Sequence, residues 1–141
     1  MQIEFKFIKS LKGMIENYSV IKLMYTDICL DNYEIMLSEM ILNGYSQIDI
    51  LFNQKLIGVA GVWENTKLWC GKYIELDNVV VLPEYRANGV GAKLIRFVEL
   101  YAKDNNVKLL VCDAYNDNYK AIKFYYNQGF IGRGTHFIKK L

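Results

Sequence analysis

The stretch that decides the fold is PEYRANGVGAKL, residues 83–94, which directly follows the apolar run NVVVL of residues 78–82. Pro83 is the only proline in the chain, and it ends the preceding strand because it has no N–H to donate to a sheet. Gly89 and Gly91 permit a turn with positive φ or a close approach of the backbone. From about residue 88 to 103 the apolar residues recur with the helical period. The stretch therefore predicts a strand, a turn and a helix in immediate succession.

The turn itself is typical of an anion site. A glycine-bearing turn that enters a helix presents free N–H groups and the positive end of the helix dipole, and both favour phosphate. Arg86 adds a fixed positive charge. The dinucleotide pattern G-x-G-x-x-G is not met, because Leu94 occupies the last position, and the Walker pattern G-K-[ST] is absent. We interpret the turn as a site for a pyrophosphate or similar anion; the alternative is that the two glycines only ease a tight turn.

The remaining patterns predict one α/β domain over residues 1–141, with a mixed sheet and one β-α-β unit centred on residues 76–114. Asn53-Gln54 is expected to form a hairpin turn, and Asn43-Gly44 is expected to end a helix. That helix carries Tyr33, Met36, Leu37, Met40 and Ile41 on one stripe. The expected strands are residues 2–8, 47–52, 55–63, 71–82 and 107–114, with one or two more in 130–141. The expected helices are residues 10–24, 27–43, 88–103 and 118–128.

Composition excludes several classes of protein. Seventeen Lys and Arg against fifteen Asp and Glu leave a net charge of +2, which favours neither nucleic acid nor a membrane surface as a partner. The N-terminal residues MQIEFKFIK alternate as a strand does, so we do not expect a signal peptide. The three cysteines, Cys29, Cys70 and Cys112, are odd in number and far apart, so we expect neither disulfides nor a cysteine metal site. We therefore expect a cytoplasmic protein.

Two sequence blocks carry a resemblance to a known family. The string V-x-P-x-x-R-x-x-G-x-G at residues 81–91 resembles motif A of the Gcn5-related N-acetyltransferases, the GNAT family. NYKAIKFYYNQGF, residues 118–130, resembles the family's N-x-x-A-x-x-F-Y-x-x-x-G-F. The blocks lie in the family's order, and the upstream elements also fit, so the resemblance covers essentially the whole chain. It implies a GNAT-type mixed sheet in which two parallel strands splay apart, with flanking helices.

The resemblance also implies acetyl-CoA as co-substrate, with no metal. Pantetheine would pair with the backbone of Val79, Val80 and Val81, and an N–H of Val80 or Val81 would polarise the thioester carbonyl. The valine run also fits an ordinary buried parallel strand. Asn118 would hydrogen-bond the cofactor. The pyrophosphate would lie on the loop formed by Arg86, Ala87, Asn88, Gly89, Val90, Gly91 and Ala92.

The implied reaction is acetyl transfer to a primary amine by direct attack. Glu75 and Asp77, two apart on one strand face, are the candidates for the base that takes the amine proton. The alternative is that both carboxylates only hold charge at a solvated strand end. Tyr125 would protonate the leaving thiolate, unless it is a core residue; Tyr126 points elsewhere on the helix. A route through Cys112 is disfavoured, because a buried free cysteine is usually a small apolar residue.

The resemblance implies that the acceptor amine is chosen by the first two helices and the loop between them, around residues 24–27, and by a last hairpin near residues 133–136. Tyr25, Asp27, Glu75 and Asp77 suggest a cation-binding pocket, which favours a small-molecule amine or polyamine over a protein lysine or N-terminus. His136 has no partner at a readable spacing and is expected on a strand. Neither nucleic acid nor a membrane is expected as a partner, and a homodimer is left open. The alternative function is a non-catalytic module on the same fold that binds CoA or a partner.

Overall fold

The computed structural model describes residues 1–141 as a five-stranded sheet in the order β1-β2-β3-β4-β5. The first four strands are antiparallel neighbours, and β5 runs parallel to β4. This is the mixed sheet that the sequence predicted. The strands are β1 (Ile3–Ile8), β2 (Tyr45–Phe52), β3 (Lys55–Lys67), β4 (Gly71–Val81) and β5 (Leu109–Cys112).

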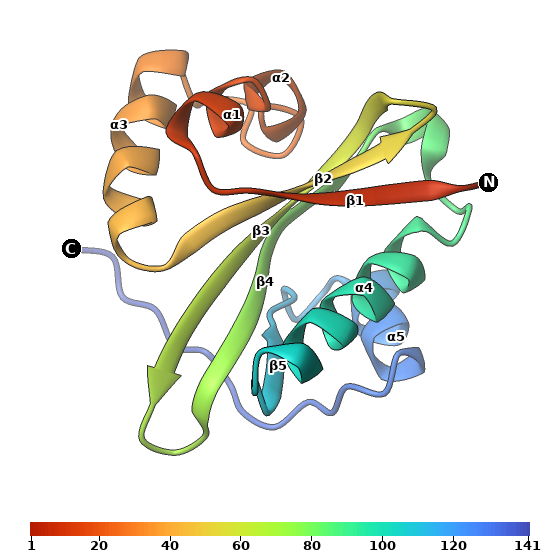
Figure 1. Ribbon diagram of the computed structural model, residues 1–141. Helices are drawn as coiled ribbons and strands as arrows, with labels where there is room; N and C mark the ends of the chain where they lie inside the picture. The colour runs from red at the N-terminus through yellow and green to blue at the C-terminus, as the bar shows by residue number, and fades with distance from the viewer.

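Helices cover both faces of the sheet (Figure 1). One face carries α1, α2 and α3, around a core that includes Met14, Leu37 and Val59. The opposite face carries α4, around a core that includes Ile48, Leu94 and Val98. The helices are α1 (Leu11–Ile15), α2 (Tyr18–Ile21), α3 (Leu30–Leu42), the 3₁₀ turn η1 (Pro83–Tyr85), α4 (Val90–Asp104) and α5 (Tyr119–Asn127). None of these helices is both long enough and apolar enough to cross a membrane.

The predicted local features are largely present. Asn53 and Gln54 both have positive φ, 50° and 64°, as a two-residue type I′ hairpin turn requires. The helix α3 ends at Leu42, directly before Asn43 and Gly44. The weak helical pattern of residues 10–24 forms two short helices, α1 and α2, and β5 is shorter at both ends than expected.

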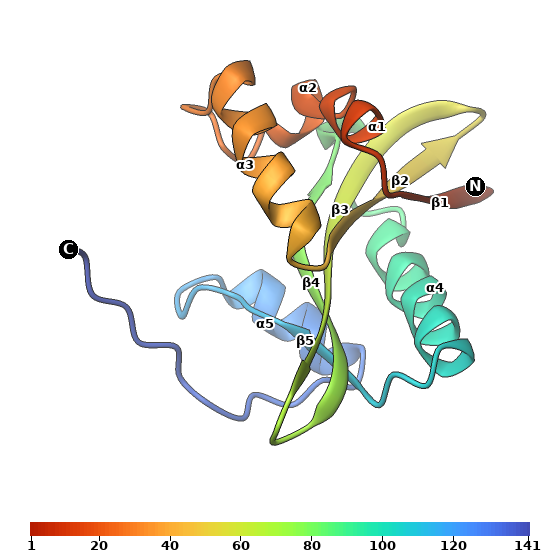
Figure 2. The ribbon, with the colours of Figure 1, turned by 60° about the vertical axis from the view of Figure 1, so that its left-hand side comes forward.

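The C-terminal strands that we expected are absent, and that prediction was wrong. Residues 130–141 form no helix or strand, and no backbone hydrogen bond joins residues 131–141 to the sheet. Figures 1 and 2 show this segment running past the β3–β4 turn, where the Arg133 guanidinium lies 4.8 Å from the ring centre of Trp69. Phe130-Ile131 and Phe137-Ile138 are adjacent apolar pairs, and Gly132 and Gly134 lie between them. Apolar and polar residues therefore do not alternate, and no single face of a strand would be buried.

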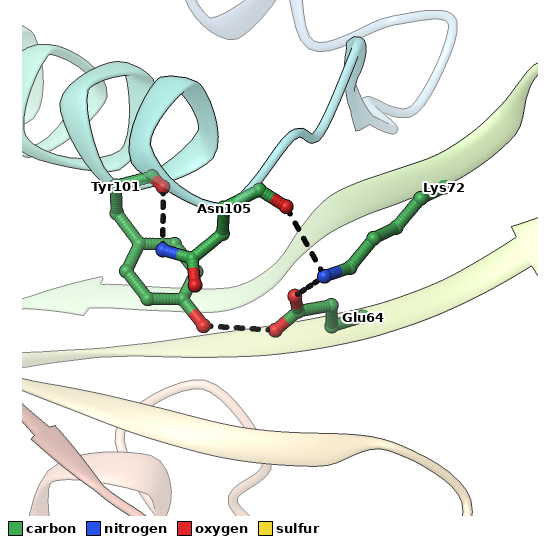
Figure 3. Close-up of polar contacts among 4 residues, drawn as sticks. All are labelled: Glu64, Lys72, Tyr101 and Asn105. Atoms are coloured by element: carbon green, nitrogen blue, oxygen red, sulfur yellow. Dashed lines mark hydrogen bonds and ion pairs between the residues drawn. The ribbon is translucent and has the colours of Figure 1, made fainter.

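The free ends of the β3–β4 hairpin and α4 are tied together by a polar cluster (Figure 3). The Tyr101 hydroxyl donates to Glu64 Oε2 at 3.0 Å, and Lys72 Nζ lies 3.0 Å from Glu64 Oε1. Lys72 also donates to the carbonyl of Asn105, at the end of α4. The helix α4 follows β4 in the chain, after the turn η1. The cluster therefore fixes α4 against β3 and β4, the two strands that carry the candidate site.

Candidate active site

The parallel strands β4 and β5 separate part-way along β4. Their pairing runs from Tyr73–Leu109 to Leu76–Cys112 and then stops. β4 continues to Val81, paired only with β3 on its other side. The edge of β4 from Asp77 to Val81 is therefore open toward β5, so N–H and C=O groups along it are available to a bound molecule. The splay expected from the resemblance is present (Figure 2).

A β-bulge stands where the strands separate. The β3–β4 register shifts between Val59 and Gly61, and Asn78 has a φ of 49°. The Asn78 side chain accepts from the Tyr45 hydroxyl at 2.9 Å and donates to the Tyr25 hydroxyl at 2.6 Å. A Cβ at Gly61 would lie 2.5 Å from Asn78 Oδ1, so the bulge requires glycine at that position. The bulge turns both Asp77 and Asn78 toward the helices α2 and α3.

Asp77 braces this bulge. Its Oδ2 accepts from the indole Nε1 of Trp63 at 3.0 Å, and its Oδ1 accepts from the backbone N–H of Asn78 at 2.8 Å. Because both oxygens are already hydrogen-bonded, the carboxylate is held in one orientation. The sequence analysis named Asp77 but missed Trp63 and Asn78. The only indication of a bulge in the sequence was the Asp77-Asn78 pair inside a predicted strand, where both residue types are rare.

The turn before α4 has the geometry of an anion cradle. Gly89 is the residue that precedes α4, with a φ of 73° and no atom within 4 Å of a Cβ built there. The N–H groups of Val90, Gly91 and Ala92 have no acceptor within the protein. Arg86 is exposed and donates through Nε to the carbonyl of Val81 at 2.8 Å, which joins the turn to the end of β4.

Gly91 has a role that the sequence did not indicate. A Cβ at this position would lie 2.9 Å from Cζ of Phe124, which is closer than real Cβ contacts occur. Glycine here therefore lets the first turn of α4 pack directly against α5. Asn118 also has a local role, since its Oδ1 accepts from the backbone N–H of Ala121 and caps α5.

Four titratable side chains gather where β5 ends: Glu75, Cys112, Asp113 and Tyr125. Burial, followed by the neighbouring carboxylates of Asp113 and Asp77, raises the pKa of Glu75. Burial, and then the adjacent Cys112 thiol, raise the pKa of Tyr125 to about 12. Tyr125 therefore keeps its proton at neutral pH.

Cys112 and His136 complete this neighbourhood. Burial, and then the Asp113 carboxylate, raise the pKa of Cys112 to about 11, so its thiol is protonated and a poor nucleophile. His136 lies with Nδ1 3.7 Å from Asp113 Oδ2, a pairing that its position in the sequence did not indicate. Tyr126, in contrast to Tyr125, is exposed.

A cavity of about 720 Å³ opens on the other side of the bulge, beneath α2, α3 and residues 24–28. Its polar residues are Thr26, Asp27, Asp77 and Asn78. Its remaining ten residues are apolar or aromatic, among them Met24, Tyr33, Met36, Met40, Tyr45 and Trp63. Residues 24–27, where we expected the acceptor to bind, line this cavity, and so does Asp77. Glu75, which we grouped with Tyr25, Asp27 and Asp77 in one pocket, does not line it. The last hairpin, expected near residues 133–136, is not formed, and residues 133–136 do not line the cavity.

Comparison with known proteins agrees with this architecture. The family model described as Acetyltransferase (GNAT) family matches residues 16–130. This chain belongs to that family. It is 39% identical to an uncharacterized N-acetyltransferase of Archaeoglobus fulgidus over 54 residues, 38% of this chain and 37% of that protein. It is 34% identical to the thialysine N-epsilon-acetyltransferase of Sus scrofa over 61 residues, 43% of this chain and 36% of that protein. The matched segments thus span little more than a third of the length of these curated relatives.

Solved structures share the fold across the whole chain of this GNAT protein. The aminoglycoside N-acetyltransferase AAC(6')-Iy in complex with CoA superposes with a TM-score of 0.81 at 18% identity, covering 99% of this chain and 95% of that one. The ribosomal-protein-alanine N-acetyltransferase of Brucella melitensis biovar Abortus 2308 gives 0.83 at 14% identity, covering 99% of both chains. One is named for a small-molecule acceptor and the other for a protein acceptor, so the shared fold does not identify the acceptor.

Proposed function

We propose that this GNAT protein transfers the acetyl group of acetyl-CoA to the primary amine of a small molecule by direct attack. The observation that carries the proposal is the open edge of β4 from Asp77 to Val81. This edge lies between the anion cradle before α4 and the cavity beneath α3, so one strand can hold both substrates. The pyrophosphate lies on residues 86–92 and pantetheine along residues 79–81, where an N–H of Val80 or Val81 polarises the thioester carbonyl. Asn118 adds a contact to the cofactor through its Nδ2.

The reaction forms one N–C bond and breaks one C–S bond. An ammonium with a pKa near 10.4 must lose a proton before its nitrogen can attack, at a cost of roughly 4 kcal/mol at neutral pH. Glu75 accepts that proton, since its raised pKa makes it a stronger base than an exposed carboxylate. Asp77, with both oxygens occupied, instead holds the bulge and the acceptor end of the cavity in position.

Tyr125 acts on the leaving sulfur. A thiolate has a conjugate acid with a pKa of about 8.5, whereas Tyr125 has a pKa of about 12. Full proton transfer from tyrosine is thus uphill by roughly 5 kcal/mol at about 1.4 kcal/mol per pKa unit. Tyr125 therefore stabilises the departing thiolate chiefly by donating a hydrogen bond, and the CoA thiol takes its final proton from water at the open cleft.

Binding and turnover test the proposal separately. Calorimetry should show that CoA binds and that pantetheine, which lacks the pyrophosphate, binds at least about a hundredfold more weakly, since several charge-assisted hydrogen bonds are lost. Incubation of acetyl-CoA with a panel of primary amines should release free thiol. Binding of CoA without thiol release from any amine would instead support the alternative, a non-catalytic CoA-binding module. Equal affinity for CoA and pantetheine would refute the pyrophosphate site.

A further inference from the structure

The cavity beneath α3 has a chemical character that narrows the acceptor. We propose that it selects a monoamine with an apolar body, alkyl or aromatic, over polyamines, aminoglycosides and peptide amines. The inference rests on the proposed acetyl transfer and names the substrate class of that same site. A cavity of about 720 Å³ lies within the range of small-molecule sites.

The hydroxyls of Tyr33 and Tyr45 and the amide of Asn78 in the cavity wall are already hydrogen-bonded within the protein, whereas Thr26 and Asp27 are exposed. The Tyr33 hydroxyl donates to the carbonyl of Met14 at 2.8 Å and accepts from Gln47 Nε2 at 2.9 Å. The Tyr45 hydroxyl donates to Asn78, whose amide in turn donates to the Tyr25 hydroxyl. The Tyr33 and Tyr45 hydroxyls and the Asn78 amide are therefore already engaged with protein partners. A ligand rich in hydroxyl groups would find few free partners, and its buried polar groups would be left unsatisfied.

The charges of the cavity suit a single amine. Asp27 and Asp77 are the only charged residues that line it, and no Lys or Arg does. Asp77 is held by Trp63 and by the Asn78 backbone, and each carboxylate oxygen can still accept a further hydrogen bond from a ligand in the cavity that Asp77 lines. One ammonium group can pair there, close to where the thioester would lie. A second ammonium group could pair only with Asp27, which is exposed, so that ion pair would add little affinity. Any further ammonium group would lie against apolar side chains, which is costly.

The apolar wall accounts for the rest of the selectivity. Met24, Met36 and Met40 supply flexible thioether side chains that adapt to ligands of different shape. Tyr45 and Trp63 also line the cavity and pack together, with ring centres 4.9 Å apart. Met24 and Met36 are 47% and 51% exposed, so apolar area at the mouth remains to be covered. An alkyl or aryl body would cover this area, whereas a peptide backbone would not.

A homologous series of amines tests the proposal directly. Thiol release from acetyl-CoA is measured with ethylamine, butylamine, hexylamine and 2-phenylethylamine, and with spermidine, kanamycin and an alanine-terminated peptide. Each methylene that enters the cavity should raise kcat/KM by roughly fourfold. Hexylamine and 2-phenylethylamine should exceed the last three acceptors by on the order of a hundredfold. The ratio of hexylamine to 2-phenylethylamine shows which apolar body fits better.

Adjacent residues on α3 provide a matched pair of variants. Met36 lines the cavity, whereas Ile35 is 67% exposed and does not. Met36→Gln should lower kcat/KM for hexylamine by about fivefold, because part of the buried apolar contact is lost. Ile35→Gln should leave it unchanged. If both variants behave alike, the cavity wall does not contact the acceptor and the proposal is overturned.

Calorimetry with the amines alone separates this proposal from the proposed reaction. If no amine releases thiol but the alkylamines bind with the fourfold increment per methylene, the cavity assignment stands and acetyl transfer fails. If thiol is released fastest with spermidine, kanamycin or the peptide, acetyl transfer stands and the apolar monoamine is refuted. If no amine binds or reacts, both are refuted.

Discussion

The two glycines of the turn before α4 should fail in different ways when each is replaced by alanine. Gly89 has a φ of 73°, with open space around a built Cβ. Gly91 has an ordinary backbone conformation, but its Cβ would meet the ring of Phe124. One substitution therefore strains the loop that we assign to phosphate, and the other displaces α5, which carries Tyr125.

The structure sets the size of each effect. At Gly89 the left-handed conformation costs alanine about 1–2 kcal/mol. At Gly91 the built Cβ lies 2.9 Å from Phe124, and ordinary contact begins at 3.4 Å, so the ring must move by about 0.5 Å. Overpacking costs about 1–3 kcal/mol, and alanine returns up to about 1 kcal/mol through its higher helix propensity. Both variants should thus lose a similar 1–2 kcal/mol of unfolding free energy.

Kinetics should separate them. A misplacement of 1 Å can cost a hundredfold in rate, so a shift of about half that size at Tyr125 should lower kcat by roughly tenfold in Gly91→Ala. Its KM for acetyl-CoA should stay within about twofold. Gly89→Ala should chiefly raise KM for acetyl-CoA, because the strained loop presents its N–H groups less well.

Urea unfolding measures the stability of both variants, and steady-state kinetics measures their kcat and KM. The control is the double variant that combines Gly91→Ala with Phe124→Leu. Leucine removes the ring that the new methyl group meets, so the double variant should recover part of the lost kcat. If Gly91→Ala weakens acetyl-CoA binding as much as Gly89→Ala does and keeps its kcat, the contact between α4 and α5 does not position Tyr125. The glycine would then serve the phosphate loop, as the sequence pattern alone suggests.

Three further substitutions test the cluster at the end of β5 and the clamp on α4. Tyr125→Phe should lower kcat by about 10- to 100-fold, the value of a hydrogen bond to a charged group, while Tyr126→Phe has almost no effect in the same assay. Glu75→Gln should lower kcat and yet raise the melting temperature at pH 7.5. The raised pKa means that the folded state favours protonated Glu75, so the free energy of unfolding falls as pH rises through that pKa. Gln mimics the protonated form, so the gain in melting temperature should vanish at pH 4. An equal gain at pH 4 and pH 7.5 would contradict the raised pKa. Tyr101→Phe should cost about 0.5–1.5 kcal/mol in urea unfolding through loss of its bond to Glu64, and an unchanged midpoint would mean that the contact contributes nothing.

Local patterns in the sequence predicted most of the framework, because each depends on neighbours in the chain. The period of residues 88–103 predicted α4, whose Val90, Leu94 and Val98 are buried. The turn at Asn53-Gln54 followed from the two-residue spacing between two strand-like runs. The separation of β4 from β5 came only through the family resemblance, since nothing in the strand itself shows where its partner stops.

The features that periodicity could not show depend on contacts between distant residues. The bulge at Asn78 is fixed by Tyr45 and Tyr25, which lie 33 and 53 residues away. The packing reason for Gly91 lies on α5, and the partner of His136 lies on the loop after β5. The final segment was predicted as one or two strands, but strand formation needs an edge to pair with and an alternation that buries one face.

The two carboxylates of β4, Glu75 and Asp77, lie in different surroundings on either side of the point where β5 separates. Glu75 stands before the point where β5 leaves, beside Asp113, in surroundings that raise its pKa and so suit it to take a proton. Asp77 stands just beyond that point, where Trp63 and the Asn78 backbone occupy both of its oxygens. Because of the bulge, the consecutive residues Asp77 and Asn78 both line the cavity, and the Asn78 amide binds the hydroxyls of Tyr25 and Tyr45. The same irregularity therefore lies both at the open strand edge that we assign to acetyl-CoA and at the wall of the cavity that we assign to the acceptor.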